Sequence, residues 1–272
     1  MAQNETGSVQ AVPAGWTRLH AFDAISNFRD FGGYPTDGGR SVVTRRLFRA
    51  ANQALATDAD LTRLAALGLE VVVDLRRPTE RAGQPSRRPA DWLAQVIEND
   101  FGDEAEPPHL TFLRQGDVSP ATIESYLQGY YRAALFEERH TDLFTRCFAA
   151  LKTLDGAILI HCAAGKDRTG LLVALIQLAL GVHRDDVIAD YLLTNATSLV
   201  ADRMETVRKS LTEGLGREVP EAAVRAFLGV EARYLDTALR IATERCGSID
   251  NYLRELGVSE ADQRALVQRF TN

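Results

Sequence analysis

The stretch of sequence that decides the fold is HCAAGKDRTG, residues 161–170. The apolar run AILI at residues 157–160 is typical of a buried strand, and the apolar run at residues 169–180 predicts a buried helix. A strand, a tight loop and a helix N-terminus in this order form an anion site, because unpaired N–H groups and the helix dipole point at the same place. Five residues separate Cys162 from Arg168, a spacing that lets the loop surround a tetrahedral oxyanion.

Cys162 is the candidate nucleophile of this loop. Inward-facing N–H groups, the helix N-terminus and Arg168 all favour its thiolate form. We expect the thiolate to attack phosphorus and water to hydrolyse the resulting cysteinyl-phosphate. Arg168 would hold two phosphate oxygens in a fork, and the Thr169 hydroxyl would hydrogen-bond the departing thiolate. This scheme needs no metal ion and no cofactor.

The other loop residues are expected to bind the phosphate or to support the loop. The predicted phosphate-binding set is Ala163, Ala164, Gly165, Lys166, Asp167, Arg168 and Thr169. His161 is expected to support the loop through a hydrogen bond from its ring to the backbone. Asp74 follows another predicted strand and is expected to orient a neighbouring group.

Release of an alcohol or phenol requires a general acid. Asp167 is the first candidate because it lies inside the loop, although an ion pair with Arg168 or Lys166 would give it a structural role instead. The alternative is an aspartate of NDFGD, residues 99–103, which follows a predicted strand and could swing into the site. The sequence favours Asp167 without deciding between them.

The HCAAGKDRTG loop resembles the CX5R signature of the cysteine-based phosphatases, and its Lys166-Asp167 pair is similar to the bacterial tyrosine/phosphoinositide phosphatase family. Further segments resemble this family: NFRDFGGY (27–34), LFRA (47–50), VVDLR (72–76) with Glu80, DYLLTN (190–195) and GSIDNYL (247–253). The resemblance spans about residues 20–257. It implies a protein tyrosine phosphatase-like fold, a loop aspartate as general acid, and activity on phosphotyrosine and, in several members, on phosphoinositides.

Three functions remain open from the sequence. The leading one is a phosphomonoesterase that acts on phosphotyrosine, with dual specificity if it also takes phosphoserine or phosphothreonine. The second is a phosphatase with the same mechanism for phosphoinositides or another small phosphoester. The third is a phosphate-binding module without turnover, and the intact Cys162, Arg168 and Thr169 argue against it. The expected partner is therefore a phosphorylated protein or a phosphoinositide.

Basic residues near the loop have two interpretations. Lys166 is either a solvated side chain or a contact for additional phosphates that also neutralises Asp167. The arginines at positions 76, 77, 81, 87 and 88 form either a solvated surface loop or a binding strip for anionic groups. Among them, Arg76 with Asp74 and Glu80 suggests an internal ion pair.

Composition narrows the class of protein. A net charge of −6 over 272 residues argues against nucleic acid as a partner. The three cysteines, Cys147, Cys162 and Cys246, are far apart, so we expect free thiols in a reducing compartment, with Cys147 and Cys246 in the core. Residues 1–19 show no signal pattern and no run of 18 apolar residues occurs. These features predict a cytoplasmic protein without a transmembrane segment, while signal-independent secretion and peripheral membrane contact stay open.

The order of elements predicts an α/β fold. Strands are expected near residues 20–25, 46–50, 70–75, 94–98 and 157–161. Helices are expected at 57–68, 119–136, 141–154, 169–180, 184–194, 196–213, 220–229, 231–246 and 248–256, and after Ser259. This order favours a small mostly parallel sheet flanked by helices, with a helical C-terminal part. Residues 1–19 would be a flexible extension of a phosphatase domain at 20–272, in which residues 196–230 form either a solvated helix pair or a lid.

Overall fold

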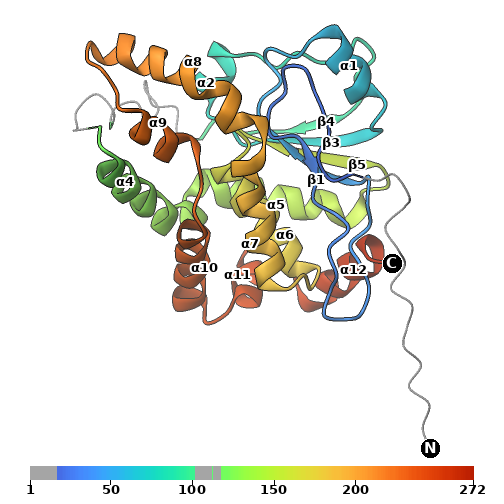
Figure 1. Cartoon of the computed structure of the whole chain (residues 1–272). Coiled ribbons are helices and arrows are strands. Elements are labelled where there is room, and N and C mark those ends of the chain that lie inside the picture. Colours follow the sequence, from blue (N-terminus) through green and yellow to red (C-terminus); the bar gives the residue numbers. More distant parts are fainter. Residues whose placement is uncertain (1–16, 102–111, 113–117) are drawn as a thin grey trace, which may run out of the picture.

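The centre of the molecule is a five-stranded sheet with the strand order β1-β2-β5-β3-β4 (Figure 1). The computed structural model describes residues 17–101, 112 and 118–272. The strands are β1 (Arg29–Asp30), β2 (Leu47–Ala50), β3 (Leu69–Asp74), β4 (Gln95–Ile97) and β5 (Ala157–His161). β1 pairs antiparallel with β2, and the other neighbours pair in parallel. The predicted small and mostly parallel sheet is therefore confirmed.

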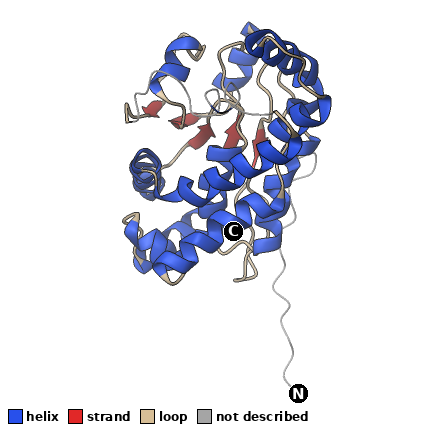
Figure 2. Cartoon of the chain, turned by 90° about the vertical axis from the view of Figure 1, so that its left-hand side faces the viewer, coloured by secondary structure: helices blue, strands red, loops and turns tan. Residues whose placement is uncertain are grey.

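Helices cover both faces of the sheet (Figure 2). Along β3, Val71 and Val73 pack into one apolar core while Val72 packs into the other. Along β5, Ile158 and Ile160 face the first core and Leu159 faces the second. This alternation follows from the two-residue period of a strand, and it explains why both strands are apolar throughout.

The helices agree closely with the sequence prediction. They are α1 (Asp58–Ala65), α2 (Pro78–Gly83), α4 (Pro120–Ala133), α5 (Glu138–Thr153), α6 (Asp167–Ala179), α7 (Arg184–Leu192), α8 (Ser198–Leu215), α9 (Glu221–Leu228), α10 (Ala232–Cys246), α11 (Ile249–Glu255) and α12 (Glu260–Phe270). Short 3₁₀ turns at Ala134–Phe136 and Leu193–Ala196 extend α4 and α7. Among these helices, α2 was not predicted, because it is only six residues long.

The strand expected at residues 20–25 is wrong, and the first strand is β1, inside the NFRDFGGY segment. The backbone N–H groups of Asp23 and Ala24 donate to the buried carboxylate of Asp60, at 2.7 and 2.9 Å. These N–H groups therefore bind a side chain in the first turn of α1 instead of forming a ladder with a strand. Asp60 also forms a capping box with Thr57 at the start of α1.

The cysteines take the positions expected of free thiols. Cys147 is buried in α5, where burial raises the pKa of its thiol, and Cys246 packs against the core at the end of α10. The cytoplasmic location inferred from free thiols stays a prediction. None of the helices in the described residues combines the length and the apolar character that a membrane crossing requires. Residues 1–16 of the expected N-terminal extension lie outside the described residues.

The sheet order brings three strand ends together. β5 lies between β2 and β3, and all three run in parallel. The segments that follow them begin at Ala51, Leu75 and Cys162, and all leave the same edge of the sheet. Ligands of open α/β sheets bind beyond this carboxyl edge.

Candidate active site

The loop after β5 has the backbone expected of an anion site. Cys162 follows the strand directly, and α6 begins at Asp167. Gly165 has a φ of +66°, a conformation that favours glycine. A Cβ atom at Gly165 would lie 2.2 Å from the carbonyl oxygen of Ala50. The loop can therefore follow this path against β2 only with glycine at position 165.

Side chains from outside the loop hold its carbonyl groups outward. Asn27 Nδ2 donates to the Gly165 oxygen at 2.8 Å, and Arg49 Nη2 donates to the same oxygen at 2.9 Å. Asn52 Nδ2 donates to the Ala163 oxygen at 3.0 Å. None of the amide N–H groups of residues 163–168 donates to another residue in the described part of the chain. These N–H groups are left for an anion.

A buried charge cluster anchors these side chains. Asp190 lies 3.4 Å from Arg29 Nε and 2.9 Å from Arg49 Nη1, and all three residues are fully buried. Arg29 also donates to the side-chain oxygen of Asn27, which turns the Asn27 amide nitrogen toward the loop. Burial opposes ionisation of Asp190, yet the two arginines hold its pKa below its ordinary value. Burial and the neighbouring Arg49 lower the pKa of Arg29 to about 10.

Sequence reasoning missed the roles of Asn27, Arg49 and Asp190. The signal was present, because the three residues belong to the NFRDFGGY, LFRA and DYLLTN segments. What those segments do not reveal is that residues from three distant parts of the chain meet behind the loop.

Arg168 is oriented by Glu80 of α2. The guanidinium forms two hydrogen bonds with the Glu80 carboxylate, at 2.5 and 2.8 Å, and a third with the Leu75 carbonyl oxygen at 3.2 Å. Burial lowers the pKa of Arg168, but Glu80 and the sulfur of Cys162 raise it well above its ordinary value. The expected internal ion pair of Arg76 is present with Asp74, whereas the Glu80 carboxylate binds Arg168.

Asp74 and His161 lie beneath the loop. Asp74 Oδ2 accepts from Arg76 Nη2 at 2.7 Å and lies 3.6 Å from His161 Nε2. The other ring nitrogen of His161 lies 3.4 Å from the carbonyl oxygen of Cys162. Burial favours the neutral form of Asp74, but His161 and Arg76 lower its pKa to about 2. Neither Asp74 nor His161 lines the cavity described next.

A cavity of about 790 Å³ opens over Cys162. The residues of the loop that line it are Cys162, Ala163, Ala164, Lys166, Asp167 and Arg168. Helices α4 and α5 contribute Tyr130 and Arg139 to its wall, and α8 and α9 contribute Val207 and Phe227. Figure 1 shows α9 between α4 and α8, and α9 packs against both helices. The 196–230 segment thus supplies part of the wall of the cavity that contains Cys162.

Lys166 connects the loop to α9. Its ammonium group donates to the carbonyl oxygens of Phe227 and Gly229, at 2.6 and 3.3 Å, and lies 3.3 Å from Asp167 Oδ2. Lys166 is 5% exposed, so the interpretation as a solvated side chain is wrong. The expected pairing with Asp167 is present.

Of the two candidate acids, only Asp167 is seen to face the cavity. Its Oδ1 atom accepts from the Tyr131 hydroxyl at 2.8 Å. In the alternative stretch, Asp100 has a side chain that is 87% exposed and pairs with Arg81 at 2.5 Å. Asp103 lies outside the described residues.

Two smaller features complete the site. Thr169 is fully buried, and its hydroxyl has no hydrogen-bond partner among the described residues. The arginines between positions 76 and 88 do not all contribute to one binding strip. Arg77 lines the cavity, whereas Arg81 pairs with Asp100 and Arg87 pairs with Asp58.

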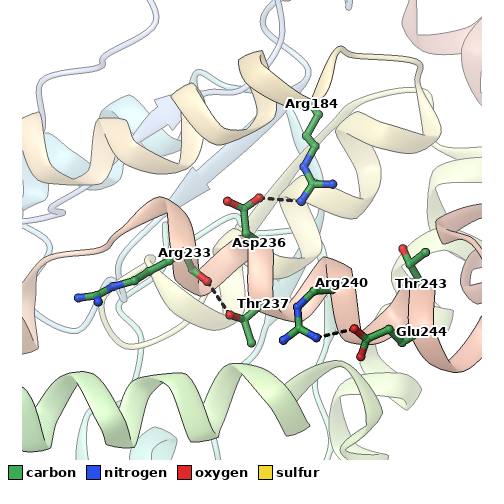
Figure 3. A pocket seen from close by; sticks show the side chains of 7 residues that line it. All are labelled: Arg184, Arg233, Asp236, Thr237, Arg240, Thr243 and Glu244. Atoms are coloured by element: carbon green, nitrogen blue, oxygen red, sulfur yellow. Dashed lines mark hydrogen bonds and ion pairs between the residues drawn. The ribbon is translucent and has the colours of Figure 1, made fainter.

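A second cavity, of about 500 Å³, lies between α7 and α10 (Figure 3). Its charged groups already bind one another, since Arg184 pairs with Asp236 at 2.7 Å and Arg240 pairs with Glu244 at 2.5 Å. The Thr237 hydroxyl donates to a carbonyl of its own helix. The residues that line this cavity include no cysteine.

Comparisons with known proteins agree with this geometry. Residues 20–272 match the sequence profile of the tyrosine phosphatase family. A candidate tyrosine-protein phosphatase of Cupriavidus necator is 38% identical over 240 residues, 86% of this chain and 82% of the relative. The triple specificity protein phosphatase PtpB of Mycobacterium tuberculosis is 30% identical over 282 residues, 93% of this chain and 96% of the relative. A tyrosine-protein phosphatase of Nostoc commune is 29% identical, with 87% of this chain and 78% of the relative covered.

Proposed function

Because this chain belongs to the tyrosine phosphatase family, we propose that it hydrolyses phosphotyrosine through a cysteinyl-phosphate intermediate on Cys162. The family resemblance expected from the loop is confirmed, and membership makes the chain a phosphoric monoester hydrolase that acts on phosphorylated substrates. The observation that carries the proposal is the loop itself, in which free N–H groups surround Cys162 and Arg168 closes one side. One relative is named for triple specificity, which supports phosphoserine and phosphothreonine as further substrates.

In the proposed first step, the Cys162 sulfur attacks phosphorus while the bond between phosphorus and the ester oxygen breaks. Asp167 gives a proton to the departing oxygen. In the second step, water attacks phosphorus, the bond between sulfur and phosphorus breaks, and inorganic phosphate leaves. Arg168 and the loop N–H groups hold the equatorial oxygens in both steps, and Glu80 keeps Arg168 in the required orientation. The Thr169 hydroxyl stabilises the thiolate that leaves in the second step.

Replacement of the nucleophile tests the intermediate. We expect Cys162→Ser to lower phosphate release from a phosphotyrosine peptide at least about a thousandfold, because a serine hydroxyl is not ionised here. Binding of the same peptide should stay within about threefold of the wild type, since Arg168 and the N–H groups remain. Acid quench of the wild-type enzyme during turnover of ³²P-labelled peptide should yield radioactive protein with phosphorus on Cys162. Turnover without any labelled Cys162 would exclude the covalent route.

Asp167 is the proposed general acid because it lines the cavity beside Cys162, whereas Asp100 pairs with Arg81 outside it. A phosphate ester with a poor leaving group needs the proton, and p-nitrophenyl phosphate needs it far less.

We therefore expect Asp167→Asn to lower kcat for phenyl phosphate by about a hundredfold and kcat for p-nitrophenyl phosphate by less than about tenfold. Asp100→Asn is the matched control and should leave both rates close to the wild type. Steady-state assays on the two substrates measure the ratio. An equal loss on both substrates in Asp167→Asn would assign Asp167 a structural role.

A second candidate function is supported by Arg139 in the cavity wall. Arg139 is 4% exposed, donates to the Leu75 carbonyl oxygen at 3.2 Å, and forms no ion pair with a carboxylate of the described residues. Burial and the nearby Arg168 and Arg77 lower its pKa to about 10. A buried cation that forms no ion pair among the described residues favours a substrate with a second anionic group, such as a phosphoinositide or another small phosphoester with several phosphates.

Side-by-side assays decide between the two substrate classes. If phosphoinositides are the substrate, we expect Arg139→Gln to lower kcat/KM for a bisphosphorylated phosphoinositide by about tenfold more than for a phosphotyrosine peptide. Arg81→Gln, from the same part of the surface but outside the cavity, should change neither. Phosphate release measured with malachite green gives both values. If Arg139→Gln lowers kcat/KM equally for both substrates, and the wild type has the higher kcat/KM for the peptide, phosphotyrosine is the substrate.

We propose that residues 196–230 act as a lid, because α8 and α9 line the cavity and Lys166 binds the end of α9. Bound orthovanadate should then slow hydrogen exchange in peptides from 203–229. Peptides from α12, which does not line the cavity, provide the control. Unchanged exchange in 203–229 at saturating orthovanadate would exclude a lid that responds to the anion.

A further inference from the structure

We infer that Tyr131 is a positioning residue for Asp167, whose carboxyl group it holds in the orientation that delivers the proton. This inference rests on the proposed function, and specifically on Asp167 as the general acid. Tyr131 lies on α4, has no exposed surface and does not line the cavity, so it reaches the chemistry only through Asp167.

Two short hydrogen bonds define the role of Tyr131. Its hydroxyl donates to Asp167 Oδ1 at 2.8 Å. The same hydroxyl lies 2.7 Å from the hydroxyl of Tyr191, which is 1% exposed. Because Tyr131 uses its proton for Asp167, its oxygen accepts from Tyr191. Burial and the Asp167 carboxylate raise the pKa of Tyr131 well above its ordinary value, so the phenol stays a donor.

Packing fixes the Tyr131 ring as well as its hydroxyl. The ring stacks on Tyr234 with centroids 5.6 Å apart and planes at 22°. It contacts Tyr130 edge to face at 5.4 Å, and Tyr191 at 6.4 Å. A buried ring held on several sides cannot turn without displacing its neighbours. The hydroxyl is therefore a rigid donor, which is what a catalytic group needs in order to keep its orientation.

The hydrogen bond also distinguishes the two oxygens of Asp167. Oδ1 is occupied by the Tyr131 hydroxyl, so the transferable proton belongs on Oδ2. In the first step, Oδ2 gives its proton to the ester oxygen as that oxygen leaves phosphorus. In the second step, Oδ2 takes a proton from the attacking water. Lys166 Nζ lies 3.3 Å from Oδ2 but also donates to the Phe227 oxygen, and therefore keeps a partner when Oδ2 is protonated.

Tyr131→Phe removes this hydroxyl and keeps the ring. We expect the ratio of kcat for phenyl phosphate to kcat for p-nitrophenyl phosphate to fall about tenfold. This is a part of the effect on kcat for phenyl phosphate expected for Asp167→Asn, because the acid is still present but less well oriented. Tyr191→Phe is the matched control. It removes an equally buried hydroxyl that hydrogen-bonds to Tyr131 and for which no hydrogen bond to Asp167 is seen, and the ratio should change by less than about twofold. Both rates come from one preparation, so the ratio does not depend on the fraction of protein that is folded.

The outcomes separate this inference from the proposed function. A lower ratio in Tyr131→Phe, together with a lower ratio in Asp167→Asn, supports the positioning role. If Asp167→Asn lowers the ratio and Tyr131→Phe leaves it at the wild-type value, the positioning role is overturned while the proposed function stands. If the wild-type protein hydrolyses neither substrate, or if Asp167→Asn leaves the ratio unchanged, the assignment of Asp167 fails and the inference fails with it.

Discussion

The structure depends on one constraint, the outward orientation of the carbonyl groups between Cys162 and α6. A peptide unit is planar and trans, so a carbonyl fixed on the outside of the loop turns the next N–H group to the inside. Asn27, Arg49 and Asn52 fix those carbonyls. The convergence of N–H groups around Cys162 is therefore imposed by side chains behind the loop, before any anion arrives. This is the preorganisation that makes electrostatic stabilisation effective in a catalytic site.

The cluster of Arg29, Arg49 and Asp190 fixes the side chains that bind the loop carbonyls. Its burial costs free energy of folding. Buried charges lose their hydration, and their mutual attraction often only balances that loss. Apolar residues would pack the same space, but they could not donate to the Gly165 carbonyl or orient Asn27. The cluster is thus better explained by the geometry of the loop than by the stability of the fold. The same argument explains why NFRDFGGY, LFRA and DYLLTN carry polar residues at positions with no exposed surface.

Local patterns predicted most of the fold and the centre of the site. The apolar strand before Cys162 and the helix after it are local features, and each lies where the sequence predicts it. Pairings between distant residues were not predictable in this way. The alternation near residues 20–25 resembles a strand, but the partner of that segment is Asp60. Glu80 is close to Arg76 in the sequence, yet the sheet order places it against Arg168.

Lys166 and Asp167 are adjacent in the sequence at the start of α6, but their side chains have different partners. Lys166 points toward the end of α9, where it binds two backbone carbonyls, and Asp167 accepts a hydrogen bond from the buried Tyr131 of α4. The two side chains remain 3.3 Å apart at their charged ends. A movement of α9 therefore changes the partners of Lys166 and, through that ion pair, the charge that Asp167 experiences. The hydrogen bond from Tyr131 would oppose any accompanying rotation of the carboxyl group, so the proposed acid would keep its direction while its electrostatic surroundings change.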